Sequence, residues 1–281
     1  MSIIHYIIPI QKPDIDIFLS QACAAPNVRF EDRGKGVYYF WVDKQSTKGV
    51  DITFEQENIE IRNTALSNRA DFQLTNDLSK ILISLSDGFI LDEEDKVKSS
   101  HAPLFSASKI EEAEIAGCLL TESIFFCYNS NPEVISVAGP IRAVYFGEEF
   151  FLKRKMLSIE QLRDEIFALI LRVNYGLPDG YKEGNVMTIS KKTAEEKLIV
   201  KLITNKINCI IGAYDYILFP ADEADGYPTV ITNKILASIL PEQWELVDEV
   251  TIVAPMLDEK DWNSLKDRAK LFDIGPKFIT G

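Results

Sequence analysis

The alternation of hydrophobic and polar residues predicts an antiparallel hairpin around residues 50–62. Val50, Ile52 and Phe54 are separated by polar residues, and after the polar turn 56–58 the segment 59–62 alternates in the same way. A period of two on both sides of a short turn is typical of a hairpin that buries one face. The residues between the apolar positions are expected to face solvent.

From Asp71 the hydrophobic residues recur at helical spacing instead. This helix is expected to end at Asp87 and Gly88, because glycine and aspartate accommodate the backbone of a helix C-terminus. A helix that follows a hairpin covers one face of the sheet. One buried set is therefore predicted, formed by Ile52, Phe54, Ile59 and Ile61 of the hairpin with Phe72, Leu78, Ile81 and Leu85 of the helix.

Other periodic segments predict further strands and helices along the chain. Strands are expected at 3–10, 37–42, 89–91, 134–137, 141–146, 186–189, 210–219 and 250–253. Helices are expected from 109 toward 128, after the capping box of Ser158 and Gln161, at 234–240 and after Asp258. The segment 198–203 is compatible with either a strand or a helix.

The order of these elements predicts an α+β fold of mostly antiparallel sheets, each covered by helices. Two α/β-sandwich-like domains are expected, 1–157 and 158–281, divided at the polar segment 152–157. A break within 92–108 is the alternative boundary. No repeat of fixed period and no low-complexity segment argues for another architecture.

The composition is that of a folded, acidic protein. Of the 281 residues, 46% are hydrophobic and 26% charged, and 30 basic against 43 acidic side chains give a formal net charge of -13. A surface of this sign repels phosphate backbones and anionic lipid headgroups, so neither nucleic acid nor membrane is expected as a partner. No apolar run reaches the length of about 18 residues that a membrane span needs.

The cysteines and the N-terminus favour a cytoplasmic protein. Cys23, Cys118, Cys127 and Cys209 occur singly, without a C-x-x-C pair or a zinc tetrad, so reduced thiols are expected. The first residues lack the basic and apolar regions of a signal peptide.

Motifs of catalysis are not found in the sequence. His5 and His101 are the two histidines, and neither belongs to a local nucleophile signature. Gly34 and Gly36 precede a strand and lack the remaining spacing of a phosphate-binding loop, so they indicate a turn. A pair of carboxylates could still hydrolyse a substrate in a cleft, but nothing selects such a pair among the 43 acids.

Two acidic patterns resemble metal sites without meeting their requirements. The segment 222–226 fails the alternation of a calcium loop, because Ala224 and Gly226 occupy the positions that should carry oxygen ligands. Asp87, Glu94 and Lys96 have the spacing of a nuclease core, but Asp95 stands where an apolar residue belongs. No metal and no cofactor are therefore expected.

Negative charge is concentrated in the segment 215–261. It contains eleven Asp and Glu residues against Lys234 and Lys260, and aromatic residues are interleaved with the acids. Acidic side chains beside exposed aromatics are suited to binding a basic protein. The aromatic side chains contribute contact area to the complex, and the charges accelerate the encounter with the partner. The candidate partner-binding residues are Asp222, Glu223, Asp225, Tyr227, Glu242, Trp244, Glu245, Asp248, Glu249 and Trp262. The alternative interpretation places the aromatics in the core, with the acids merely covering it.

Three hypotheses of function follow. The first is a protein-binding module that engages a basic partner, comparable in physical type to the immunity proteins that neutralise cationic toxins. The second is an enzyme, a hydrolase that uses carboxylates and His101. The third is a non-catalytic subunit of a larger assembly. A perturbed carboxylate pair in a deep pocket would favour the second, and a broad acidic face with exposed aromatics the first.

Overall fold

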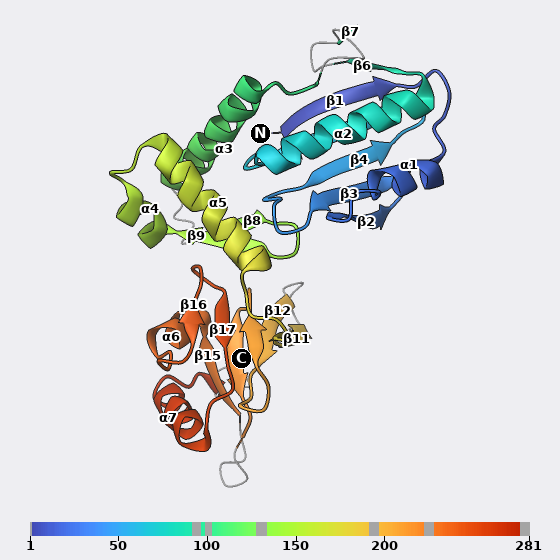
Figure 1. The fold of residues 1–281 in the computed structure, drawn as a ribbon. Coiled ribbons are helices and arrows are strands. Elements are labelled where there is room, and N and C mark those ends of the chain that lie inside the picture. The colour runs from blue at the N-terminus through green and yellow to red at the C-terminus, as the bar shows by residue number, and fades with distance from the viewer. Residues whose placement is uncertain are drawn as a thin grey trace. The chain divides into compact units, whose positions relative to one another are not determined.

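A computed structural model describes residues 2–91, 97–98, 103–127, 134–190, 197–221 and 228–275. The chain divides into two compact units, 1–176 and 177–281. Both mix helices with sheets in which antiparallel pairs predominate, so the fold is α+β (Figure 1). The helices among the described residues are too short or too polar to cross a membrane.

The first unit is built on a seven-stranded sheet in which every neighbouring pair is antiparallel. Its strands lie in the order β2 (Val28–Gly34), β3 (Val37–Val42), β4 (Val50–Phe54), β5 (Ile59–Thr64), β1 (Ser2–Ile8), β6 (Phe89–Leu91) and β7 (Val97–Lys98). Two helices, α1 (Ile15–Ala22) and α2 (Arg69–Ser86), pack on one face of this sheet (Figure 1). Gly34 and Gly36, both at positive φ, form the turn between β2 and β3 that the sequence predicts.

The predicted contact between the hairpin and its helix is confirmed. All eight residues belong to one hydrophobic core or pack against it. Those that are buried are Ile52, Ile59, Ile61, Phe72 and Leu78, whereas Phe54, Ile81 and Leu85 are partly buried. The predicted end of α2 is also confirmed, because Asp87 adopts the left-handed conformation of a C-cap.

The rest of the first unit is a smaller assembly of helices around a two-stranded sheet. It comprises α3 (Ala107–Cys127), β8 (Val134–Ala138), β9 (Ala143–Gly147), α4 (Glu148–Arg154) and α5 (Ile159–Tyr175). The capping box of Ser158 and Gln161 opens α5, as predicted. This helix packs against α3 and β9. The compact units therefore divide after Gly176, whereas the predicted boundary after Leu157 assigns α5 to the second unit.

The second unit contains two four-stranded sheets. One has the order β10 (Lys182–Glu183), β13 (Cys209–Ile211), β17 (Ile252–Ala254) and β16 (Glu245–Leu246). The other has the order β11 (Asn185–Ser190), β12 (Lys197–Leu202), β14 (Tyr216–Phe219) and β15 (Thr229–Thr232). Two helices, α6 (Asn233–Ser238) and α7 (Glu259–Lys270), complete the unit.

The second unit corrects one strand prediction and resolves another. The prediction of one strand over 210–219 is wrong: β13 and β14 are separate and belong to different sheets. The chain must leave the first sheet at Gly212 before it can enter the second. The ambiguous segment 198–203 lies mostly in β12, which pairs with β14 in parallel. The predicted helix after Asp258 is confirmed as α7, and Asp258 caps it by accepting the backbone N–H of Asp261.

Candidate functional site: an acidic surface on the second unit

The structure describes six of the ten residues predicted to bind a partner. Asp222, Glu223, Asp225 and Tyr227 lie outside the described residues. The described ones are Glu242, Trp244, Glu245, Asp248, Glu249 and Trp262, and they occupy three different environments.

The two tryptophans lie in the hydrophobic core of the second unit. Trp244 and Trp262 are each 7% exposed. The indole nitrogen of Trp244 donates to the carbonyl oxygen of Pro255 at 3.0 Å, and the ring of Trp262 lies 5.6 Å from that of Phe219. Neither is an exposed anchor, so this part of the predicted site is corrected. Trp262 lies on the buried face of α7 and Trp244 directly before β16, and in both places burial removes a large apolar surface from water.

Asp248 is buried and holds a turn. Its carboxylate accepts the backbone N–H groups of Val250 at 2.9 Å and Thr251 at 2.6 Å, and the hydroxyl of Thr251 at 3.1 Å. These bonds fix the connection between β16 and β17. The carboxylate therefore organises backbone, and it does not present its charge to a partner. Glu249 beside it is partly exposed.

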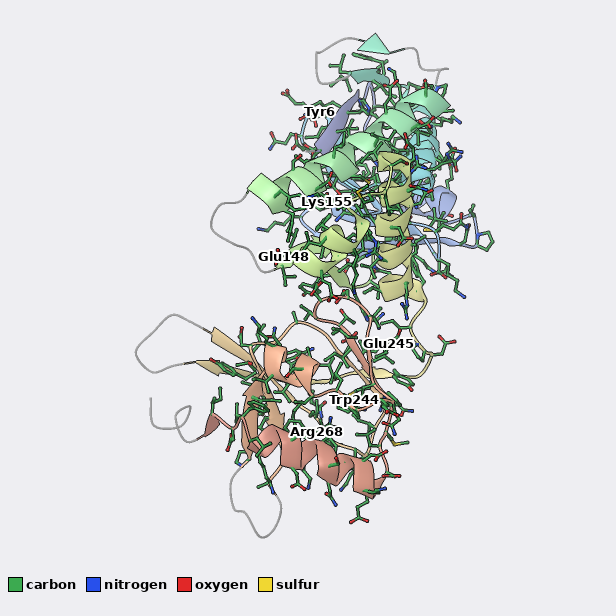
Figure 2. All side chains as sticks on the ribbon, turned by 90° about the vertical axis from the view of Figure 1, so that its left-hand side faces the viewer. Tyr6, Glu148, Lys155, Trp244, Glu245 and Arg268 are labelled. Atoms are coloured by element: carbon green, nitrogen blue, oxygen red, sulfur yellow. The ribbon has the colours of Figure 1, made fainter. Side chains whose placement is uncertain are left out.

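Glu242 and Glu245 are exposed, and their segment contacts a second acidic segment. Figure 2 shows Glu245 next to Trp244 in the second unit. The side-chain amide of Gln243, between them in sequence, donates to the carboxylate of Asp261 at 2.7 Å. Asp258 lies one turn before Asp261, at the N-cap of α7. Glu242, Glu245, Asp258 and Asp261 thus come from two segments that are hydrogen-bonded to each other. They are called the acidic surface below.

Two exposed apolar side chains lie in the same two segments. Leu246, next to Glu245, is 41% exposed, and Met256, two residues before Asp258, is 53% exposed. Leu246 and Glu245 form β16, which ends its sheet and pairs with β17 alone among the strands described. An edge strand leaves backbone groups to which a partner can bind.

The other flank of α7 carries a polar hollow of about 680 Å³. Glu259, Asn263 and Asp267 follow one another at intervals of four residues, so they share one face of the helix. Asn205 and Lys266 complete the polar lining. Two carboxylates and two amides are suitable acceptors for a lysine or arginine side chain.

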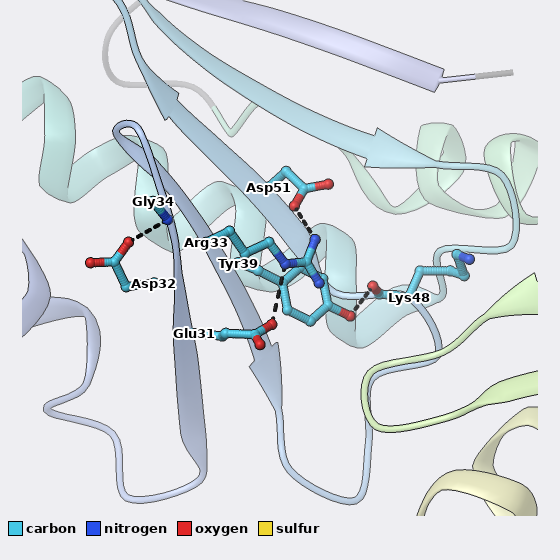
Figure 3. Close-up of polar contacts among 7 residues, drawn as sticks. All are labelled: Glu31, Asp32, Arg33, Gly34, Tyr39, Lys48 and Asp51. Atoms are coloured by element: carbon cyan, nitrogen blue, oxygen red, sulfur yellow. Dashed lines mark hydrogen bonds and ion pairs between the residues drawn. The ribbon is translucent and has the colours of Figure 1, made fainter. Parts of the chain in front are cut away.

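Two carboxyl groups of the first unit have raised pKa values, and each is next to an arginine. Burial raises the pKa of Asp51, whereas the guanidinium of Arg33 at 2.9 Å opposes the shift. Figure 3 shows that this guanidinium also covers the ring of Tyr39, at 3.8 Å from its centroid, and contacts Glu31. These are the contacts of an ion-pair network on the sheet. They do not pair one carboxyl with another, which a two-carboxylate hydrolase requires.

Glu114 repeats the arrangement on α3. Burial raises its pKa, while a backbone N–H of Arg69 and the charge of Arg163, at 3.6 Å, lower it. The raised pKa values of Asp51 and Glu114 are thus explained by burial next to an arginine. Neither residue lines the hollow on α7.

No protein-family model, curated protein or solved structure matches the chain. The interpretation of the acidic surface therefore depends on its own geometry and charge.

Proposed function

We propose that this protein is a binding module whose acidic surface engages a basic protein partner. The observation that carries the proposal is the hydrogen bond of Gln243 to the partly exposed Asp261, which joins the segment of Glu242 and Glu245 to that of Asp258. Leu246 and Met256 supply exposed apolar area within the same segments. Exposed charges of one sign together with exposed apolar area allow an interface to combine electrostatic steering with apolar contact.

The charge of the whole chain supports a basic partner. A net charge of -13 adds a long-range attraction for cationic proteins, which accelerates their encounter with the surface. The partner would place lysine or arginine side chains against Glu242, Glu245 and the hollow on α7. An inhibitor that neutralises a cationic protein, as immunity proteins do, is the form of this function that we favour.

Partner capture with charge-reversed variants tests the proposal. The variant Glu242→Lys/Glu245→Lys reverses two charges of the acidic surface. The control Glu111→Lys/Glu112→Lys makes the same change in net charge at two exposed positions of α3, in the other unit. Each protein is immobilised, exposed to native lysate, and the bound proteins are identified by mass spectrometry at low and high salt.

The proposal predicts that wild type and the α3 variant retain the same basic protein, while the acidic-surface variant loses it. Retention should also fall at high salt, because exposed charges are screened over about 8–10 Å at physiological ionic strength. Equal loss from both variants would show that only total charge matters. Equal retention by both would show that the acidic surface does not bind the partner.

A further inference from the structure

A groove in the first unit is lined mostly by apolar side chains, with the hydroxyls of Thr64, Thr121 and Ser136 and a single charged residue, Lys48. It has a volume of about 270 Å³ and lies between α3, β8 and the connection from β5 to α2. Leu120 and Ile124 of α3 form one wall, and Ile135 and Val137 of β8 belong to the lining as well. The volume is slightly below the range of about 300–1,000 Å³ typical of sites for drug-sized ligands.

The loop that carries Lys48 is fixed by a buried carboxylate. Asp71 is fully buried, and it accepts the backbone N–H groups of Lys48 at 3.0 Å and Gly49 at 2.9 Å. It also accepts the hydroxyl of Thr47 at 3.1 Å and the backbone N–H of Asn68 at 3.0 Å. Charge-assisted bonds to so many donors hold the loop in one conformation. The position from which the Lys48 side chain departs is therefore defined.

The backbone beneath the groove is closely packed and strained. Leu66 has a φ of 70°, a left-handed conformation that costs free energy for a leucine. Helix α3 approaches this residue at Gly117, where a Cβ atom would come within 2.8 Å of the backbone nitrogen of Leu66. Glycine at this position lets Leu120 and Ile124 lie over the connection. The wall of the groove is thus part of a rigid contact between α3 and the start of α2.

The Lys48 ammonium group lacks an ion-pair partner in the described part of the chain. Its side chain extends away from Tyr39, whose hydroxyl donates to the Lys48 carbonyl oxygen (Figure 3). The ammonium donates to the carbonyl oxygen of Ala138 on β8. Burial lowers the pKa of this amine, and the carboxylates of Asp71 and Asp51 oppose the shift from a distance without forming an ion pair with it. A lysine ammonium has three donors, so this bond leaves capacity for an anion.

We propose that the groove binds a small apolar carboxylic acid, with its carboxylate on Lys48 and its tail against Leu120, Ile124, Ile135 and Val137. A polyanion is not the expected ligand, because the groove has one cation to pair with its charges. The groove also favours an acid over a neutral apolar molecule, because a bound carboxylate would accept a charge-assisted hydrogen bond from the ammonium, which Asp71 and Asp51 do not. This site is independent of the acidic surface, which lies in the other unit.

NMR titration of the full chain with octanoate tests the assignment. Octanol, which has a tail of the same length and no charge, is the comparison. Octanoate should bind saturably and shift the amide resonances of Leu66, Thr121 and Val137. Octanol should bind at least about tenfold more weakly, because a hydrogen bond to a charged group is the larger contribution. Saturable shifts elsewhere, or equal affinities for the two probes, would overturn the assignment.

Two variants separate the charge from the apolar wall. Lys48→Met keeps the length of the side chain and should weaken octanoate at least about tenfold while leaving octanol unchanged. Ile124→Glu adds an anion at a lining position that is 40% exposed, and it should also repel octanoate. Lys109→Met, at an exposed position on the same helix, is the control and should bind both probes as wild type does. Unchanged octanoate affinity in Lys48→Met or in Ile124→Glu would contradict the proposal.

Discussion

The indole nitrogen of Trp244 donates to the carbonyl oxygen of Pro255 at 3.0 Å, and the side chain is 7% exposed. This bond joins the segment before β16 to the segment after β17. Trp244 is therefore the core residue of the segment that carries Glu242 and Glu245. Its neighbours Gln243 and Glu245 are exposed. The contribution of this tryptophan should appear in stability rather than in direct contact with a partner.

Substitutions of Trp244 are expected to destabilise the second unit. Trp244→Phe keeps most of the packing but leaves the Pro255 carbonyl without its donor, and should cost about 1–3 kcal/mol in the free energy of unfolding. Trp244→Ala should cost about 3–5 kcal/mol, the range for large core residues. Urea unfolding measures both, with Leu246→Ala as the exposed control on β16. A loss below about 1 kcal/mol for Trp244→Ala would show that the side chain is not part of the core.

Asp71 is expected to be among the most sensitive polar residues of the first unit. Asp71→Asn replaces an acceptor with a donor that faces the N–H groups of Lys48, Gly49 or Asn68. Loss of such charge-assisted bonds in the interior should cost about 2–4 kcal/mol. Asp77→Asn, at an exposed position on the same helix, should cost less than about 0.5 kcal/mol. Equal effects of the two substitutions in urea unfolding would refute the role assigned to Asp71.

Lys201 is a buried amine whose charge opposes folding. It is 6% exposed on β12, and burial lowers its pKa from 10.5, while Glu183 and the thiol of Cys209 oppose the shift. Because the pKa is lower in the folded state, protonation is favoured on unfolding. The free-energy cost of burying the charged amine is fully present below the folded pKa. It disappears as the pH rises from there through 10.5.

Lys201→Met should therefore stabilise the protein at neutral pH, by about 1–2 kcal/mol. The difference in free energy of unfolding between this variant and wild type should shrink as the pH approaches 10.5. Lys206→Met, at an exposed position, is the control and should change stability by less than about 0.5 kcal/mol. A difference that stays constant, or grows, between pH 8 and 10.5 would contradict the sign of the shift.

The elements that the sequence predicts well are those whose local pattern agrees with their tertiary contacts. In α2 the hydrophobic period matches the face that the helix buries, and in α7 the predicted cap at Asp258 marks the start that the structure shows. Strand β2 was not predicted, because Val28 is its one buried residue and the others are exposed and partly charged. The short helix α1 was also missed, although Asp14 caps it and gives a local signal.

The site was predictable in charge but not in arrangement. Composition locates the excess of acids in 215–261, and Glu242 and Glu245 are exposed as expected. An amphipathic segment has the same pattern whether its aromatics face a core or a partner, so Trp244 and Trp262 could not be assigned. The pairing of Gln243 with Asp261 depends on a hydrogen bond across 18 residues, which local patterns do not encode.

The association rate between this protein and a basic protein recovered in the capture experiment, measured across a salt series, tests the central claim most directly. Glu242→Lys/Glu245→Lys should associate about tenfold or more slowly than wild type at low salt, and the difference should narrow as salt rises. Glu111→Lys/Glu112→Lys should remain much closer to wild type, because its reversed charges lie in the other unit. Equal association rates for the two variants at every salt concentration would contradict a binding role for the acidic surface.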